Sequence, residues 1–433
     1  MNHPVIKILL ELREGREVLR KMEGRWFVIS YFTGVDGMAA SIHADMRIKE
    51  LQARSVEVQV LSSMAAKSDH SMVQRVISLF PSGIRFEVRH VFRKRKKNAV
   101  NILLKSFFIL LLFPFYALEK ILLRFDPTWS WYLSASREGR KIAREFNPGV
   151  IYSTGGPASA HLVALAVKKA SGAKWIAEFQ DPLLHPTTYR SDSERKHFVR
   201  IEDAVAQHAD AAVYVTEGAR KRALDRVSFK GRTAVIYPGA DSTQTINTNV
   251  PPDNGVVIAH IGTLAGTRNL DAMISGVNLL RKRDPDAESL IKVIQYGFTS
   301  REVMTSSGPT GDRIVFAGRV PHDEALMRMG YAHVLLLIQN ADDVSRETIP
   351  SKVYEYLLTG KPILGLVFRN PELTSILKYH GHHAADIEDP SSIAFALMKI
   401  VKDFREGKLT EPGLIEPSIT LSSSVEQLMK LAE

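Results

Sequence analysis

The sequence predicts an α/β protein with two doubly wound, Rossmann-like domains. Short apolar runs rich in β-forming residues alternate with segments of helical length, which is the pattern of a parallel sheet covered by helices. The alternation comes in two series, and the segment between them is rich in proline, glycine and small polar residues. A chain of 433 residues also exceeds what one hydrophobic core supports. Doubly wound sheets bind ligands at the carboxyl ends of their strands, so we expect the domains to face each other across a cleft that holds the site.

The first series predicts one domain over residues 1–240. It begins with an amphipathic helix at 5–22 and a buried strand at 26–32, and a loop containing Gly34 and Gly37 follows. The helix and strand after this loop complete a βαβ unit, which favours a parallel sheet. The further strands are expected at 56–61, 150–153, 174–179 and 211–215, and the helices at 39–53, 158–170 and 194–209.

The second series predicts another domain over residues 256–416, after a linker at 241–255. A closing helix is expected within 417–433. The strands are expected at 256–261, 291–296, 314–316, 334–338 and 362–367, and the helices at 269–282 and about 350–359.

Composition limits the classes of function. Hydrophobic residues make up 45% of the chain and charged residues 24%, which is typical of a globular protein. There are no cysteines, which excludes disulfides, thiolate metal sites and cysteine nucleophiles and fits a reducing compartment. The net charge of +10 favours an anionic partner: nucleic acid, nucleotide phosphates or an anionic membrane surface. The N-terminus lacks the pattern of a secretory signal, so we expect a cytoplasmic location.

A basic run followed by an apolar stretch favours the membrane among these partners. The stretch at 106–118 has 13 residues without charge, which is short of the ~18–20 that span a bilayer, and Pro114 interrupts it. One interpretation is a segment that lies in the membrane interface, and the other is a buried core helix beside a solvated charge run. The first interpretation assigns membrane contact to the basic residues Arg93, Lys94, Arg95, Lys96 and Lys97 and to the apolar residues Phe107, Phe108, Leu111 and Phe115.

The most informative motif lies at residues 347–362. Glu347 is expected on a loop and Glu355 on the helix that follows, with Pro350 in the first turn. The start of this helix, with Ser351 and Lys352, is a natural place for an anion. A carboxylate there can bind two sugar hydroxyl groups while Lys352 supplies charge to a phosphate. Two solvated glutamates beside a capped helix are the simpler alternative.

This stretch resembles the E-x7-E region of glycosyltransferase family 4, including the ending E-x-x-x-x-G-x-P at Glu355, Gly360 and Pro362. Residues 261–271 and 316–320 resemble two further segments of that family. In the first domain, two other segments resemble a branch of the family that acts on lipid-linked glycans. These segments lie at 151–162 and 175–182.

The resemblance implies a two-domain GT-B enzyme that transfers a sugar with retention of configuration, without a metal or other cofactor. The donor is expected to be a UDP- or GDP-linked sugar, and the acceptor a lipid-linked glycan or a polysaccharide bound by the first domain. Glu355 would bind ribose, Glu347 would contact the donor sugar, and Arg268 stands where the family has a phosphate-binding lysine. The remaining donor-binding candidates are Lys352, Ser351, Thr263, Gly262, Arg319 and Gly37, and the remaining catalytic candidates are Asp181 and His161.

The chain departs from the family at several positions, and two of them change which residues are candidates. Thr263 stands where many members have an arginine, which leaves phosphate binding to Arg268 and Lys352. Gln180 stands where many members have a histidine, which leaves Asp181 as the nearby polar candidate.

Two other classes of function remain open from the sequence. One is a basic α/β protein that binds nucleic acid, although the basic residues flank leucine and phenylalanine rather than interleaving with stacking aromatics, so no nucleic-acid partner is expected. The other is a GT-B-like epimerase or inactive scaffold. We expect the enzyme to be cytoplasmic and peripheral on the inner face of the cell membrane.

Overall fold

A computed structural model describes residues 24–35, 38–66, 72–93, 99–123, 125–185, 191–241, 255–306, 313–409 and 419–433. The expected helix at 5–22, Gly37, the basic residues 94–97 and almost all of the linker at 241–255 lie outside the described residues. The backbone of Arg93 is described but its side chain is not.

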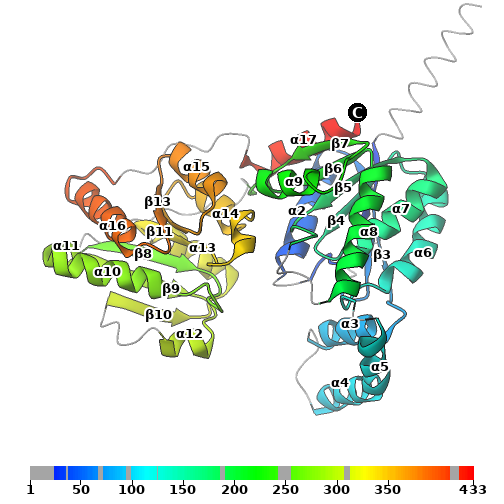
Figure 1. Cartoon of the computed structure of the whole chain (residues 1–433), viewed down its shortest axis with the longest axis horizontal. Helices are drawn as coiled ribbons and strands as arrows, with labels where there is room; N and C mark the ends of the chain where they lie inside the picture. Colours follow the sequence, from blue (N-terminus) through cyan, green and yellow to red (C-terminus); the bar gives the residue numbers. More distant parts are fainter. Residues whose placement is uncertain are drawn as a thin grey trace, which may run out of the picture. The chain divides into compact units, whose positions relative to one another are not determined.

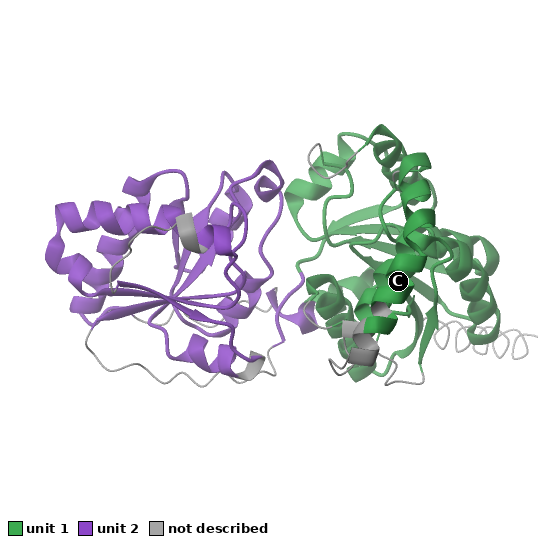
Figure 2. Cartoon of the chain, turned by 90° about the horizontal axis from the view of Figure 1, so that it is seen from below, with its two compact units in different colours: residues 1–237, 424–433 green, residues 238–423 purple. Residues whose placement is uncertain are grey.

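The chain forms two compact units (Figure 2). Unit 1 comprises residues 1–237 and 424–433, and unit 2 comprises residues 238–423. Each unit contains one parallel sheet, of seven strands in unit 1 and six strands in unit 2. The predicted fold class, an α/β protein with two doubly wound domains, is confirmed.

The sheet of unit 1 has the strand order β3-β2-β1-β4-β5-β6-β7. Right-handed connections place α6, α7 and α8 side by side on one face and α2 on the other (Figure 1). The strands are β1 (Arg25–Ile29), β2 (Glu57–Ser63), β3 (Val73–Val76), β4 (Val150–Gly155), β5 (Lys174–Phe179), β6 (Ala211–Tyr214) and β7 (Arg232–Val235). The helices are α2 (Ala39–Ala53), α3 (Pro81–Arg93), α4 (Ala99–Leu111), α5 (Phe113–Leu122), α6 (Trp131–Phe146), α7 (Ser159–Ser171), α8 (Asp192–His208), α9 (Glu217–Leu224) and the end of α17 (Leu421–Ala432).

The sheet of unit 2 has the strand order β10-β9-β8-β11-β12-β13. Helices α10 and α16 pack against each other on this unit. The strands are β8 (Val256–Ile261), β9 (Ile291–Tyr296), β10 (Ile314–Gly318), β11 (Val334–Ile338), β12 (Ile363–Val367) and β13 (His383–Asp386). The helices are α10 (Asp271–Arg283), α11 (Pro285–Ser289), α12 (Arg301–Ser306), α13 (His322–Gly330), the 3-10 helix η2 (Asp343–Arg346), α14 (Lys352–Leu358), α15 (Pro371–Tyr379) and α16 (Pro390–Arg405).

The apolar stretch forms two helices rather than one. Helix α4 ends at Leu111, and Pro114 lies in the first turn of α5, where its missing N–H group costs no hydrogen bond. Many large apolar side chains on these helices are exposed, so this stretch is not a buried core helix. None of the described helices combines the length and the hydrophobicity that crossing a bilayer requires.

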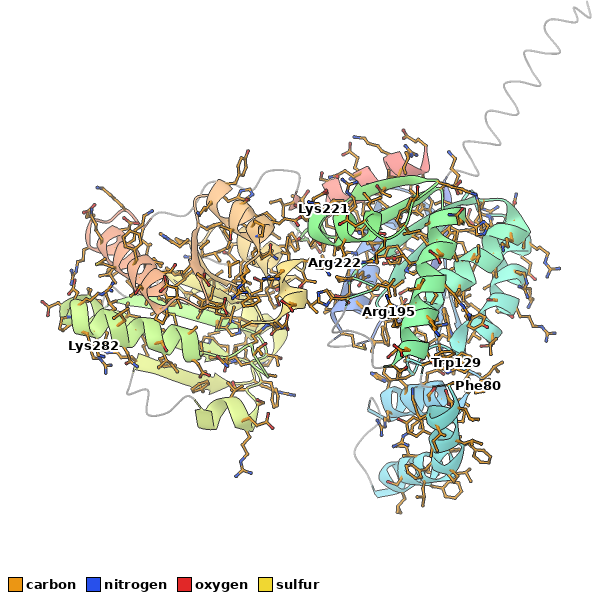
Figure 3. All side chains as sticks on the ribbon, viewed as in Figure 1. Phe80, Trp129, Arg195, Lys221, Arg222 and Lys282 are labelled. Atoms are coloured by element: carbon orange, nitrogen blue, oxygen red, sulfur yellow. The ribbon has the colours of Figure 1, made fainter. Side chains whose placement is uncertain are left out.

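Buried carboxylates attach α3 and α5 to the rest of unit 1. Glu119 on α5 is 6% exposed and accepts hydrogen bonds from the Ser82 backbone N–H at 2.8 Å and from Trp129 Nε1 at 2.7 Å. Trp129 packs beside Phe80, with ring centroids 4.7 Å apart, where these helices join the unit (Figure 3). These contacts fix the apolar helices to the sheet domain.

Glu87 on α3 makes the second attachment. It is 2% exposed and accepts hydrogen bonds from Tyr31 Oη at 3.1 Å and Ser78 Oγ at 2.7 Å. Burial raises the pKa of Glu87 from 4.5 to about 7, although the hydrogen bonds from Ser78 and Tyr31 act in the opposite direction. The folded protein therefore binds this proton more tightly than the unfolded chain does.

This difference predicts a pH dependence of stability. The stabilisation from protonated Glu87 is fully present below a pH of 4.5 and is lost as the pH rises through about 7. We expect its contribution to the free energy of unfolding to fall by ~2–3 kcal/mol between about pH 5 and pH 8. Urea unfolding followed by tryptophan fluorescence measures this in unit 1, which holds all 4 tryptophans. Glu87→Gln should remove the dependence, while the exposed control Glu57→Gln should keep it; an unchanged pH slope in Glu87→Gln contradicts this assignment.

Candidate functional site

The strand order of unit 2 reverses between β8 and β11. The connection after β8 leads to β9 on one side, and the connection after β11 leads to β12 on the other side. The loops at 262–270 and 339–351 therefore flank a switch point, which is where open α/β sheets bind ligands. The predicted residues Gly262, Arg268 and Glu347 lie on these two loops.

Two amides build the loop after β11. Gln339 donates hydrogen bonds from Nε2 to the backbone oxygens of Ser345 and Thr348, and Asn370 Nδ2 donates to the same two oxygens at 2.8 and 3.0 Å. Both amides follow the carboxyl ends of their strands. In the sequence, Glu347 lies between Ser345 and Thr348, whose carbonyl groups accept these hydrogen bonds, and it is 8% exposed. This loop is fixed by its neighbours, so the position of Glu347 is defined before any ligand binds.

Helix α14 brings the second glutamate of the motif to the loop after β8. The Tyr356 hydroxyl accepts a hydrogen bond from the Ile261 backbone N–H at 3.0 Å, at the end of β8. Glu355 precedes Tyr356 and forms an ion pair with Lys352, with 2.6 Å between Oε2 and Nζ. Both side chains of this pair are about one-third exposed, so a ligand can reach them. Ser351 is exposed, and its side chain makes no capping hydrogen bond to α14.

Positive side chains gather at the same loop. Burial lowers the pKa of Arg268, and the charge of Asp342 on the opposite loop raises it. His260 lies at the end of β8 and is 5% exposed, and it shares a hydrogen bond of 2.9 Å between Nδ1 and the Leu336 backbone oxygen. Burial lowers the pKa of His260 to about 4, and the charges of Arg268 and Lys352 lower it further. The two cations are thus close to one neutral imidazole, although they come from different elements.

The remaining donor-binding candidates are Gly262, Thr263, Arg319 and Gly37. Gly262 is partly exposed and Thr263 is exposed, both at the start of the loop after β8. Arg319 is exposed beyond the end of β10 and stacks on Phe298, with its guanidinium carbon 4.8 Å from the ring centroid. Nothing in the described contacts joins Arg319 to Arg268 or Lys352. Gly37 lies outside the described residues.

Unit 1 contains a second polar group, centred on Glu178 in β5. This residue is fully buried, and its carboxylate accepts hydrogen bonds from His43 Nε2 at 2.9 Å and Arg47 Nη2 at 3.3 Å. Tyr152 and Thr154 from the neighbouring strand donate their hydroxyl protons to the same carboxylate. Burial alone would raise the pKa of Glu178, but the charges of His43 and Arg47 and the hydrogen bonds lower it, and the net direction is downward. Glu178 is therefore ionised.

The catalytic candidates of unit 1 lie nearby in different environments. Asp181 is exposed, and desolvation by the surrounding protein raises the pKa of its carboxyl group, although the charge of His43 acts in the opposite direction. His161 is 2% exposed and shares a 2.8 Å hydrogen bond between Nδ1 and Ser153 Oγ, and burial lowers its pKa to about 4. This environment favours a packing role for His161. Gln180 Nε2 donates to Thr154 Oγ1 at 2.9 Å.

Sequence reasoning missed several residues that build these groups. Gln339, Asn370 and Tyr356 act on backbone atoms of distant loops, and no local pattern marks them. Glu178 had a visible signal, because it is a charged residue inside the apolar strand W-I-A-E-F. Among the described residues, no group of three or more histidine, aspartate or glutamate side chains is arranged to hold a metal ion.

Comparisons with known proteins give a domain match in unit 1 and the fold of the chain. Residues 40–239 match the family model described as a glycosyl transferase 4-like domain. No curated protein sequence matches the chain. Among solved structures, TarM is similar with a TM-score of 0.62 and 9% identity, over 94% of this chain and 98% of its own.

Two further structures are similar at comparable levels. The Anabaena protein HepE in complex with UDP has a TM-score of 0.57 and 12% identity, over 94% of both chains. The lipopolysaccharide outer core galactosyltransferase WaaB has a TM-score of 0.56 and 11% identity, over 94% of this chain and 98% of its own. The chain therefore has the GT-B fold, and its residues 40–239 form a glycosyl transferase 4-like domain.

Proposed function

We propose that the protein is a glycosyltransferase that moves a sugar, with retention of configuration and without a metal, from a UDP- or GDP-linked donor to a lipid-linked glycan or polysaccharide. We place this reaction at the cytoplasmic face of the cell membrane. The observation that carries the proposal is the group at the β8–β11 switch point, where Arg268, Lys352, Glu347 and Glu355 come from two loops and one helix.

The chemistry of a nucleotide-sugar fits this group. When the glycosidic bond to the diphosphate breaks, negative charge develops on the leaving group, and fixed cations stabilise it best in a site with little water. Arg268 is partly buried, and Arg268 and Lys352 both lie close enough to His260 for their charges to lower its pKa, so we expect both to bind the diphosphate. This pair of cations supports a reaction that does not depend on a metal. HepE, which has the same fold, forms complexes with UDP and with UDP-glucose.

The two glutamates would have different roles, one in binding the nucleotide and one in stabilising the transition state. The carboxylate of Glu355 is accessible and can accept hydrogen bonds from both ribose hydroxyl groups, while its ion pair with Lys352 holds that cation in place. Glu347 is buried on the fixed loop, so its charge can act on positive charge that develops at the anomeric carbon. We assign nucleotide binding to Glu355 and stabilisation of the transition state to Glu347.

The exposed apolar side chains of α4 and α5 support a membrane location. Phe107 is 59% exposed, Leu111 55% and Phe115 61%, and the basic residues 93–97 precede this surface in the chain. A water-soluble monomer rarely exposes so many large apolar groups together. Two short helices can lie in the headgroup region while the basic run attracts anionic lipids. A membrane location suits an acceptor attached to lipid, and WaaB is a glycosyltransferase of the lipopolysaccharide outer core.

The assignment of Glu355 predicts a loss of nucleotide affinity. Glu355→Ala should weaken binding of the cognate nucleotide by about 1.5–3 kcal/mol, because charged hydrogen bonds to ribose are lost. Calorimetry with UDP and GDP measures the change. The matched control is Glu406→Ala, which removes an exposed glutamate paired with Lys408 and should bind nucleotide as the wild type does. Equal affinities of Glu355→Ala and the control would remove Glu355 from the site.

The assignment of Glu347 predicts a loss of turnover instead. Glu347→Gln keeps the size of the side chain and removes its charge, so transfer at saturating donor should fall more than nucleotide affinity. Arg268→Ala and Lys352→Ala should also slow transfer, and EDTA should change the rate little. Transfer is measured with a panel of donors and membrane extract as the acceptor source. Wild-type turnover in Glu347→Gln would make this residue structural.

The membrane surface predicts two separable contributions to binding. Replacing Phe107, Leu111 and Phe115 with serine should release the full chain from anionic vesicles even at low salt, because salt does not screen the apolar contribution. Replacing the five basic residues at 93–97 with glutamine should weaken binding by about 1 kcal/mol per residue, and raising salt should have the same effect in part. Vesicle flotation measures both.

The control for this experiment is Phe395→Ser, which removes an exposed aromatic side chain on α16 (64% exposed). The control should float as the wild type does, and circular dichroism should show that every variant keeps its fold. A wild-type protein that never floats contradicts the membrane location.

A further inference from the structure

We propose that His43 and Asp181 form a binding site for sugar hydroxyl groups in unit 1, and that Glu178 is the positioning residue of this site. The inference rests on the proposed function only in taking the ligand to be a sugar. It concerns residues outside the donor-binding group of unit 2. The argument depends on the hydrogen-bond capacity left on His43, on its neighbours and on its place in the fold.

The carboxylate of Glu178 determines which nitrogen of His43 carries a proton. An ionised carboxylate only accepts hydrogen bonds, so Nε2 of His43 must donate to it. In the neutral ring, the other nitrogen, Nδ1, then keeps its lone pair and is an acceptor. Nδ1 has no hydrogen-bond partner among the described residues, and the side chain is 11% exposed. The ring is thus rigidly held with one acceptor atom left for a ligand.

Arg47 makes this arrangement selective for neutral hydroxyl groups. It lies one helical turn after His43 on the same face of α2, and its side chain is fully buried against Glu178. The positive charge of Arg47 is therefore balanced inside the protein and is not presented to a ligand. Asp181 is close enough to His43 for a positive charge on that ring to act on its carboxyl group, and it adds further acceptor atoms. When the His43 ring is neutral, the two side chains are neighbouring acceptors without an accessible cation, which favours hydroxyl donors over a phosphate.

The place of these residues in the fold supports a ligand site. The strand order of unit 1 reverses between β1 and β4, so the loops after these strands flank a switch point like the one in unit 2. His43 lies in the first half of α2, which follows β1. Asp181 follows β5, and its Oδ2 would lie 3.8 Å from a Cβ atom added to Gly156, directly after β4.

His161 shows what a packed histidine looks like in the same unit. Its Nδ1 shares a hydrogen bond with Ser153 Oγ, and its ring contacts Phe179 with centroids 4.6 Å apart. Within the described part of the chain, no charged group forms a hydrogen bond with it. His43 differs because one ring nitrogen donates a hydrogen bond to a buried carboxylate and because its side chain is partly accessible to solvent. Burying Glu178 and Arg47 is expensive, and apolar residues of similar volume would pack as well. We infer that these two residues are buried because they fix the orientation of His43.

The hydroxyl group can come from two sources, the donor sugar or the acceptor. If it belongs to the donor, His43→Gln should weaken binding of UDP-glucose while binding of UDP stays unchanged. If it belongs to the acceptor, both affinities should stay unchanged and the KM for the acceptor should rise. Either result supports the site, and the comparison of UDP with UDP-glucose separates the two sources.

The first test does not depend on activity. Full-length protein labelled with 15N-histidine is examined by NMR, and the His43 signals are identified by their loss in His43→Gln. We expect Nε2 to carry the proton and Nδ1 to be unprotonated. The Nδ1 signal should shift when methyl α-glucoside or UDP-glucose is added, and this shift should be smaller in Asp181→Asn. The reverse tautomer, or an Nδ1 signal that responds to neither compound, overturns the inference.

The second test measures transfer to acceptors in membrane extract. His43→Gln and Asp181→Asn should each reduce kcat/KM by roughly tenfold, the value of about one hydrogen bond, with UDP affinity unchanged. Glu178→Gln should reduce it as well and should also alter the tautomer of His43, which a merely structural role does not predict. The control His208→Gln, at the exposed end of α8, should behave as the wild type. Wild-type kinetics in both His43→Gln and Asp181→Asn overturn the inference.

The two tests separate this inference from the proposed function. Asp181 is exposed, so Asp181→Asn keeps the fold even if His43→Gln does not. A wild-type protein that neither binds UDP or GDP nor transfers sugar contradicts the proposed function, and the NMR test still decides whether His43 responds to a sugar.

Discussion

The reversal of strand order in each sheet is the constraint on which both sites depend. Parallel strands need right-handed connections, so two neighbouring strands whose connections leave in opposite directions keep the space above their carboxyl ends uncovered. In unit 2 this happens between β8 and β11, and in unit 1 between β1 and β4. Every residue that we assign to donor binding or to hydroxyl binding, apart from Arg319 and Gly37, lies on a loop or helix that follows a strand at or next to these points.

Buried polar side chains hold the loops and side chains beside these uncovered spaces in fixed positions. Gln339 and Asn370 hold the loop of Glu347 through its carbonyl groups, and Glu178 holds His43 through one ring nitrogen. In each case a group that is costly to bury is fully hydrogen-bonded, so the cost is offset and the neighbouring side chain becomes rigid. Glu119 acts in the same way on the exposed apolar helices, which it ties to the sheet of unit 1.

The sequence predicts the central strands and the edge strand β10, but it misses the other three edge strands. Strands β5, β8, β9 and β11 begin and end where expected, because a parallel strand buried on both faces is a continuous apolar run. The strands β3, β7 and β13 were not expected, because they lie at sheet edges and are short and partly polar. The motif at 347–362 predicts the two glutamates as site residues, but Gln339 and Asn370 act through backbone groups of distant loops, so only the folded structure reveals their contacts.

The central claim is that a nucleotide-sugar binds to unit 2 at the β8–β11 switch point. Hydrogen–deuterium exchange of the full chain, with and without UDP or GDP, tests this directly. We expect one of the two nucleotides to slow exchange of the backbone amides in the loops at 262–270 and 339–351 and at the start of α14, because a ligand there excludes water from both loops. Unchanged exchange in both loops with either nucleotide, or protection confined to other segments, would contradict the account.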